Sequence, residues 1–173
     1  MRLSEIADRL ADLEGRDADE IHIRLRNPLF KGLLQGESGR SRNSPADYPV
    51  LELIRARLLM AMFDCGLSTA ELALVNEMLN ESHGVSTTTL EAMIEGAAAG
   101  EPWIILVRFN MLQGGKRKVT PKFFKDSISR QQMGFSTVEE IVKGGKFSSI
   151  FGGTHLMTSV VPASELIRPL LES

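Results

Sequence analysis

The chain has 173 residues and a formal net charge of −2, and 43% of its residues are hydrophobic and 24% charged. This length allows one domain or two small ones, and this composition excludes a disordered chain. No apolar run approaches the roughly 20 residues that a membrane helix needs, and the start MRLSEIADRL is amphipathic rather than a signal peptide. The only cysteine, Cys65, excludes an intrachain disulfide. We therefore expect a cytoplasmic protein without a membrane partner.

The N-terminal residues predict two short helices joined by a turn. In LSEIADRLADLEG, apolar residues recur at helical spacing, and Gly15 follows as a stop. After the turn Gly15–Asp17, the residues ADEIHIRLRN predict a second helix that Pro28 ends. Two short helices with a glycine-containing turn are typical of a helix-turn-helix.

A loop rich in glycine and arginine follows, in the stretch KGLLQGESGRSRNSPADYPV, residues 31–50. Beyond it, PVLELIRARLLMAMFDCG predicts a long amphipathic helix that Gly66 ends, and STAELALVNEML predicts another that begins at once. Several helix starts carry the spacing of a capping box, which pairs Asp17 with Glu20, Ser68 with Glu71, Thr88 with Glu91, and Ser136 with Glu139.

The pattern changes near residues 83–100, where VSTTTLEAMIEGAAAG predicts one more helix. WIILVRFNML and HLMTSVVP predict strands, whereas TPKFFKDSISRQQMG, STVEEIVKGG and ASELIRPLLE predict helices. We therefore divide the chain into residues 1–83 and 84–173. The expected fold class is α+β, with a mainly helical winged helix-turn-helix head followed by a small α/β domain for dimerisation or sensing.

The first half resembles the MerR family of transcription regulators over residues 2–80. LSEIADRL stands where that family has its first helix, GLLQGESGR resembles its passage from recognition helix to wing, and LIRARLLMAMFDCGLSTAELALV resembles its helix pair. The order of the three pieces is more specific than any one of them. The resemblance implies a winged helix-turn-helix regulator that binds pseudo-palindromic promoter DNA as a dimer.

Residues 22–42 are the basic stretch of an otherwise slightly acidic chain, because Glu37 is their only acidic residue. An arginine on a recognition helix can bond a guanine edge with two hydrogen bonds. In a wing, glycines let the backbone approach a phosphate strand, arginines neutralise phosphates, and serines donate hydrogen bonds to them. The residues that we expect to bind DNA are His22, Arg24, Arg26, Asn27, Lys31, Ser38, Arg40, Ser41 and Arg42.

Other chemical sites have less support in the sequence. His22, His83 and His155 are far apart and lack the spacing of zinc ligands, so we expect no metal site. We expect Cys65 to be buried by packing rather than reactive. No catalytic motif is present, so we expect neither an enzyme nor a cofactor. The basic GGKRK segment fits either a second nucleic-acid contact or a solvated loop.

The expected function is a sequence-specific transcription regulator that binds double-stranded DNA as a homodimer. RNA polymerase or another regulator would be a further partner. Two alternatives stay open at this point. The same head could bend DNA as an architectural or excisionase-type factor of a mobile element, or it could be a protein-interaction module that has lost DNA binding.

Overall fold

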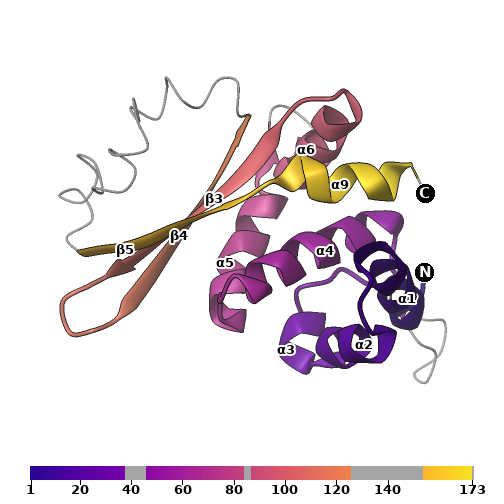
Figure 1. Cartoon of the computed structure of the whole chain (residues 1–173), viewed down its shortest axis with the longest axis horizontal. Coiled ribbons are helices and arrows are strands. Elements are labelled where there is room, and N and C mark those ends of the chain that lie inside the picture. The colour runs from indigo at the N-terminus through magenta and orange to yellow at the C-terminus, as the bar shows by residue number, and fades with distance from the viewer. Residues whose placement is uncertain (38–45, 84–86, 126–153, 173) are drawn as a thin grey trace. The chain divides into compact units, whose positions relative to one another are not determined.

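The structure is a computed structural model that describes residues 1–37, 46–83, 87–125 and 154–172 (Figure 1). The chain divides into two compact units: unit 1 comprises Met1–Leu79 with Pro169–Ser173, and unit 2 comprises Asn80–Arg168. Seven helices and two small antiparallel sheets lie within the described residues, which confirms the α+β class. Within the same residues, no helix has both the length and the apolar character needed to cross a membrane.

Unit 1 begins with the two helices that the sequence predicts. Helix α1 runs over Leu3–Glu14 and ends at Gly15, whose φ of 63° is left-handed and therefore favours glycine. Helix α2 runs over Ala18–Arg26, packs against α1, and starts at Asp17, whose carboxylate accepts two backbone N–H groups of the first turn. Both helices and the glycine turn are thus confirmed (Figure 1).

Pro28 ends α2 as predicted, but it also begins a short helix of its own. Helix α3 covers Pro28–Lys31, with the proline in its first turn, where a missing N–H costs nothing. The side chain of Asn27 caps it, because Oδ1 accepts the backbone N–H of Leu29 at 3.0 Å. The chain therefore turns sharply after α2 and leads directly into the loop that the sequence predicts as a wing.

Helices α4, over Val50–Asp64, and α5, over Thr69–Asn80, complete unit 1. Ser68 and Glu71 form the predicted reciprocal cap of α5, with their backbone and side-chain groups 2.7–3.4 Å apart. Helix α4 is buried over most of its surface, rather than along one stripe as an amphipathic helix would be. The core of unit 1 includes Ile6, Leu10, Ile21, Leu25, Leu53, Leu58, Leu59, Met62, Leu72 and Val75, each at most 2% exposed.

Within the described residues, unit 2 contains one complete helix, most of a second helix and a three-stranded antiparallel sheet. A minimal hairpin of β1, Ser82–His83, and β2, Thr87–Thr88, precedes helix α6, Thr89–Ala98, which the predicted Thr88 and Glu91 capping box starts. The sheet has the order β4-β3-β5, where β3 is Trp103–Met111, β4 is Arg117–Lys125 and β5 is Thr154–Val161. The last helix, α9, covers Ala163–Leu171, as predicted from ASELIRPLLE.

The helix predicted over TPKFFKDSISRQQMG is wrong for residues 120–125, which belong to β4. Strand β4 pairs with β3 from Trp103 opposite Lys125 to Met111 opposite Arg117. Pro121 is tolerated there because β4 is an outer strand among the three described ones, so its missing N–H interrupts no second ladder. The rest of that segment, and the predicted helix STVEEIVKGG, lie outside the described residues.

Candidate nucleic-acid interface

One face of α2 is exposed and carries side chains of the kind that read DNA. The opposite face buries Ile21 and Leu25 in the core of unit 1. Ile23, Arg26 and the following residue, Asn27, are exposed. Because residues three or four apart share one side of a helix, these three lie together on the solvent side of α2. Helix α2 therefore presents a surface that a partner can reach.

Arg24 lies beside this face, and its guanidinium already interacts with other groups of unit 1. Its guanidinium lies 2.6 Å from a carboxylate oxygen of Asp64 and 3.2 Å from one of Glu20. It also stacks over the ring of Phe63, with 5.0 Å from Cζ to the ring centroid. Its side chain is only 22% exposed. We therefore infer that Arg24 joins α2 to the end of α4.

The remaining predicted DNA-binding residues differ in their setting. His22 is half-buried, whereas Lys31 is exposed at the end of α3. Asn27 is exposed, but its side-chain oxygen already caps α3. The residues expected on the wing lie outside the described part of the chain, namely Ser38, Arg40, Ser41 and Arg42.

The two ends of the predicted wing are joined in a paired stem. Glu37 and Asp47 exchange two backbone hydrogen bonds, of 2.8 and 3.1 Å, in an antiparallel bridge. Tyr48 exchanges two more with Met1, of 2.7 and 2.8 Å. The Tyr48 ring is 4% exposed and covers Gly36, where an added Cβ would lie 2.6 Å from ring carbon Cε1. Glu37 and Asp47, on either side of the undescribed segment, therefore lie together, and Tyr48 ties this stem to the N-terminus.

A buried charged network, which no local sequence pattern indicates, lies next to this stem. Glu52 and Arg55 on α4 form a salt bridge of 3.0 Å, although their side chains are 0% and 2% exposed. The second carboxylate oxygen of Glu52 accepts the backbone N–H of Gln35, next to the stem, at 2.9 Å. Arg55 donates to Asn76 Oδ1 at 2.7 Å, and Asn76 donates to the carbonyl of Leu33 at 3.0 Å. The network thus ties α4, α5 and the chain before the wing together.

A hollow of about 290 Å³ opens beside the exposed face of α2. Its apolar lining comes from three elements, since Ile23 lies on α2, Phe30 on α3 and Phe63 on α4. Polar groups complete the lining, namely Glu20, Arg24, Asn27 and Thr69. The hollow therefore places apolar carbon next to groups that can donate and accept hydrogen bonds.

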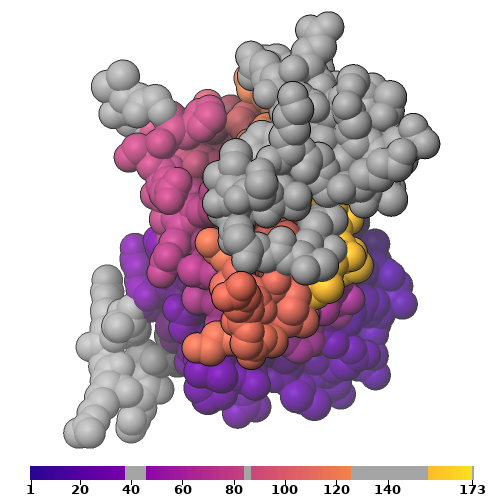
Figure 2. All heavy atoms as spheres, turned by 90° about the vertical axis from the view of Figure 1, so that its left-hand side faces the viewer, coloured from indigo at the N-terminus to yellow at the C-terminus, as the bar shows by residue number. Residues whose placement is uncertain are grey.

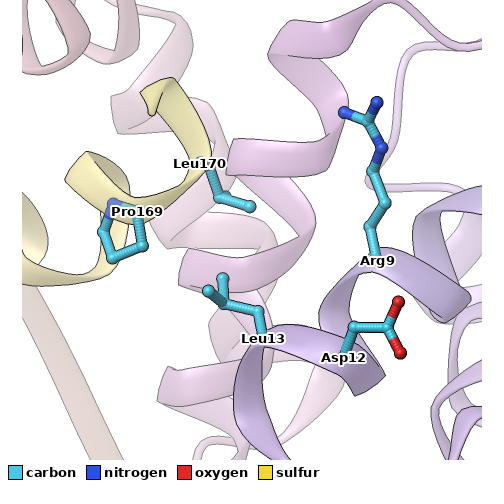
Figure 3. A pocket seen from close by; sticks show the side chains of 5 residues that line it. All are labelled: Arg9, Asp12, Leu13, Pro169 and Leu170. Carbon is cyan, nitrogen blue, oxygen red and sulfur yellow. The ribbon is translucent and has the colours of Figure 1, made fainter. Parts of the chain in front are cut away.

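A second hollow of unit 1, of about 350 Å³, lies between residues of α1 and the end of α9. Figure 3 shows Leu13 and Leu170 pointing toward one another, with the Arg9 side chain extending away from them. Asp12 and Pro169 complete the lining. The lining thus combines apolar side chains with one basic and one acidic side chain.

The GGKRK segment covers part of the turn between β3 and β4 and the first two residues of β4, in unit 2. Gly114 and Gly115 adopt left-handed backbone angles, with φ of 84° and 74°, so glycine is favoured at both positions. Lys116, Arg117 and Lys118 are exposed beside them, and Figure 2 shows the orange residues of this hairpin on the surface. This geometry suits a solvated turn and a phosphate contact equally well.

A polar hollow of about 360 Å³ lies at the start of β3 in unit 2. Lys125 forms a salt bridge of 2.8 Å with Glu101, and its hydrogen bond lowers the pKa of that carboxyl. The indole N–H of Trp103 donates to the same carboxylate at 3.3 Å, and His83 packs edge-on against the indole ring. Glu101, Lys125 and Trp103 therefore satisfy one another, which indicates a structural cluster.

The expectation that Cys65 is buried is wrong. Cys65 is exposed, because it follows the last residue of α4 and caps that helix beyond the core. Among the described residues, no group of three or more histidine, cysteine, aspartate or glutamate side chains is placed to hold a metal ion. His83 is exposed, and the His155 side chain lies outside the description.

The chain matches no protein-family model, and neither a curated protein nor a solved structure matches it.

Proposed function

We propose that the protein is a sequence-specific DNA-binding transcription regulator whose unit 1 is a winged helix-turn-helix. The observation that supports the proposal is the pair of short helices α1 and α2, joined by a turn at Gly15 and followed by a stem in which Glu37 pairs with Asp47. The loop between Glu37 and Asp47 contains Arg40 and Arg42 together with Gly39. A helix with an exposed face and a cationic loop are the two parts that groove and backbone recognition require.

In this proposal, α2 enters the major groove and the loop follows a phosphate strand. Arg26 is exposed on α2 and has the fork geometry that matches a guanine edge. Lys31 follows at the end of α3, where it would contact a phosphate. Arg24 stabilises the helix in this role rather than reading a base, because Asp64 and Glu20 already hold its guanidinium.

We further propose that the working form is a homodimer joined through unit 2. A single winged head makes few base contacts, and pairing two heads raises affinity by about 10²–10⁴ where the geometry fits. Strand β5 is an outer strand among the described strands of its sheet, and it exposes three large apolar side chains. Such an edge favours pairing with a second chain. These side chains are Leu156, Met157 and Val160, each about half exposed.

Salt-dependent binding to duplex DNA is the first expected result. Each phosphate that the full-length protein neutralises should contribute about 0.9 to the slope of log affinity against log salt. Arg40→Ala combined with Arg42→Ala should reduce that slope by roughly 1.8, because two phosphate contacts are lost. Arg26→Ala should instead cost about 1–3 kcal/mol and relax the preference for one base per half-site. Fluorescence anisotropy with labelled duplexes over a salt series measures both effects.

Arg9→Ala is the matched control, because Arg9 is an exposed arginine of unit 1 that lies on α1. The Arg9→Ala variant should have the same slope of log affinity against log salt, and the same base preference, as the unsubstituted protein. Absence of binding at low salt, or binding that salt does not weaken, would contradict the proposed function.

A further inference from the structure

Ile23 is the most exposed large hydrophobic side chain in the described part of the chain, at 73%. Single exposed apolar residues are common and by themselves carry no meaning. The position of Ile23 is what distinguishes it, because it lies in the middle of α2 on the face that it shares with Arg26 and Asn27. The fold gains little from an isoleucine there, since most of its surface remains in water.

The neighbours of Ile23 give this side chain an apolar setting within a polar surface. Ile23 and Phe63 line the hollow beside α2, and Phe63 is itself 36% exposed. Arg24 also lines the hollow, but its guanidinium is stacked over Phe63 and paired with Asp64. Ile23 therefore offers a partner exposed branched aliphatic carbon on the same face as Arg26 and Asn27.

In the major groove, the only apolar group that distinguishes one base from the others is the 5-methyl group of thymine. We propose that Ile23 reads this methyl group, so that each half-site of the target contains a thymine opposite the middle of α2. The inference rests on the proposed function and deepens it, because it assigns the apolar part of base recognition to one residue. Arg26, one turn further along the same face, would then contact a neighbouring base pair.

The test removes the methyl group from the DNA without changing any hydrogen bond. Full-length protein first selects its preferred sequence from random duplexes. That duplex is then resynthesised with deoxyuridine in place of thymine, one position at a time. At one thymine per half-site, the substitution should weaken binding about fourfold, which is the effect of one buried methyl group. Ile23→Ala should bind the thymine duplex about fourfold more weakly and no longer distinguish thymine from deoxyuridine at that position.

Two controls make the result specific. Ile23→Ala should unfold at the same temperature as the unsubstituted protein or slightly higher, because the residue is exposed and alanine favours helix more than isoleucine does. Leu74→Ala removes another exposed apolar side chain, 44% exposed on α5, and should leave the deoxyuridine effect unchanged.

The outcomes separate this inference from the proposed function. Selection of a preferred duplex with no position sensitive to deoxyuridine would overturn the role of Ile23 and leave DNA recognition standing. A deoxyuridine effect of equal size in Ile23→Ala would show that another residue reads the methyl group, and would also overturn it. Failure to select any sequence would contradict the proposed function itself.

Discussion

Replacement of Arg55 by methionine is expected to destabilise unit 1 by about 3–5 kcal/mol. Arg55 and Glu52 form a salt bridge whose two side chains are almost completely buried. Without the guanidinium, the carboxylate of Glu52 would stay buried with the backbone N–H of Gln35 as its remaining described partner. Asn76 would lose a donor as well, because Arg55 donates to its Oδ1. An uncompensated buried charge is among the most costly single changes that a fold can undergo.

Urea unfolding followed by far-ultraviolet circular dichroism measures this loss. The double variant Glu52→Gln with Arg55→Met should recover a large part of it, since it removes both charges together. Glu165→Gln is the matched control, because it breaks the exposed pair of Glu165 and Arg168 and should cost at most about 1 kcal/mol. A loss of less than about 1 kcal/mol for Arg55→Met would contradict the role of the buried pair.

Alanine in place of Gly36 is expected to weaken both stability and DNA binding. The added Cβ would lie 2.6 Å from Cε1 and 2.9 Å from Cζ of the Tyr48 ring, closer than real Cβ contacts come. The ring is buried, and backbone hydrogen bonds to Met1 fix the residue that carries it. The stem of the wing must therefore shift, at a cost of about 1–3 kcal/mol for overpacking.

If Arg40 and Arg42 bind phosphates as proposed, a displaced stem should weaken these contacts, so affinity for duplex DNA should fall roughly tenfold, equal to about 1.4 kcal/mol. Thermal unfolding and fluorescence anisotropy measure the two effects. Tyr48→Leu with Gly36→Ala provides the control, because the smaller side chain makes room for the Cβ. The double variant should bind better than the sum of the single effects implies. Strict additivity would show that the contact between the ring and position 36 does not position the wing.

Local signals predicted the helices of this fold well. The caps at Asp17, Ser68 and Thr88 each satisfy backbone groups of the helix that follows them, so a few adjacent residues specify each start. The local pattern of β4 predicts a helix, because the pairing with β3 that makes this segment a strand involves residues elsewhere in the chain. Tertiary pairing decided the conformation of that segment, and no local pattern around Pro121 reports it.

In the candidate site, too, local features could be predicted from the sequence and long-range contacts could not. The two short helices with their glycine turn and the exposed Arg26 follow from the sequence, since helical spacing determines which residues share a face. The ion pair of Arg24 with Asp64 could not be predicted, because the two residues are 40 positions apart in the sequence. The stem is equally non-local, as Met1 and Tyr48 are 47 residues apart. Glu52 and Arg55 resembled surface residues of an amphipathic helix, and only the burial of α4 shows that they form an internal pair.

The central claim is that unit 1 recognises a specific duplex sequence, and selection from a random duplex library with full-length protein tests it most directly. Repeated rounds of binding and amplification, followed by sequencing, should enrich a short motif present twice in inverted orientation. Sedimentation of the complex should show two chains on each selected duplex, as a dimer of winged heads requires. A library whose composition after selection equals its composition before would contradict the claim.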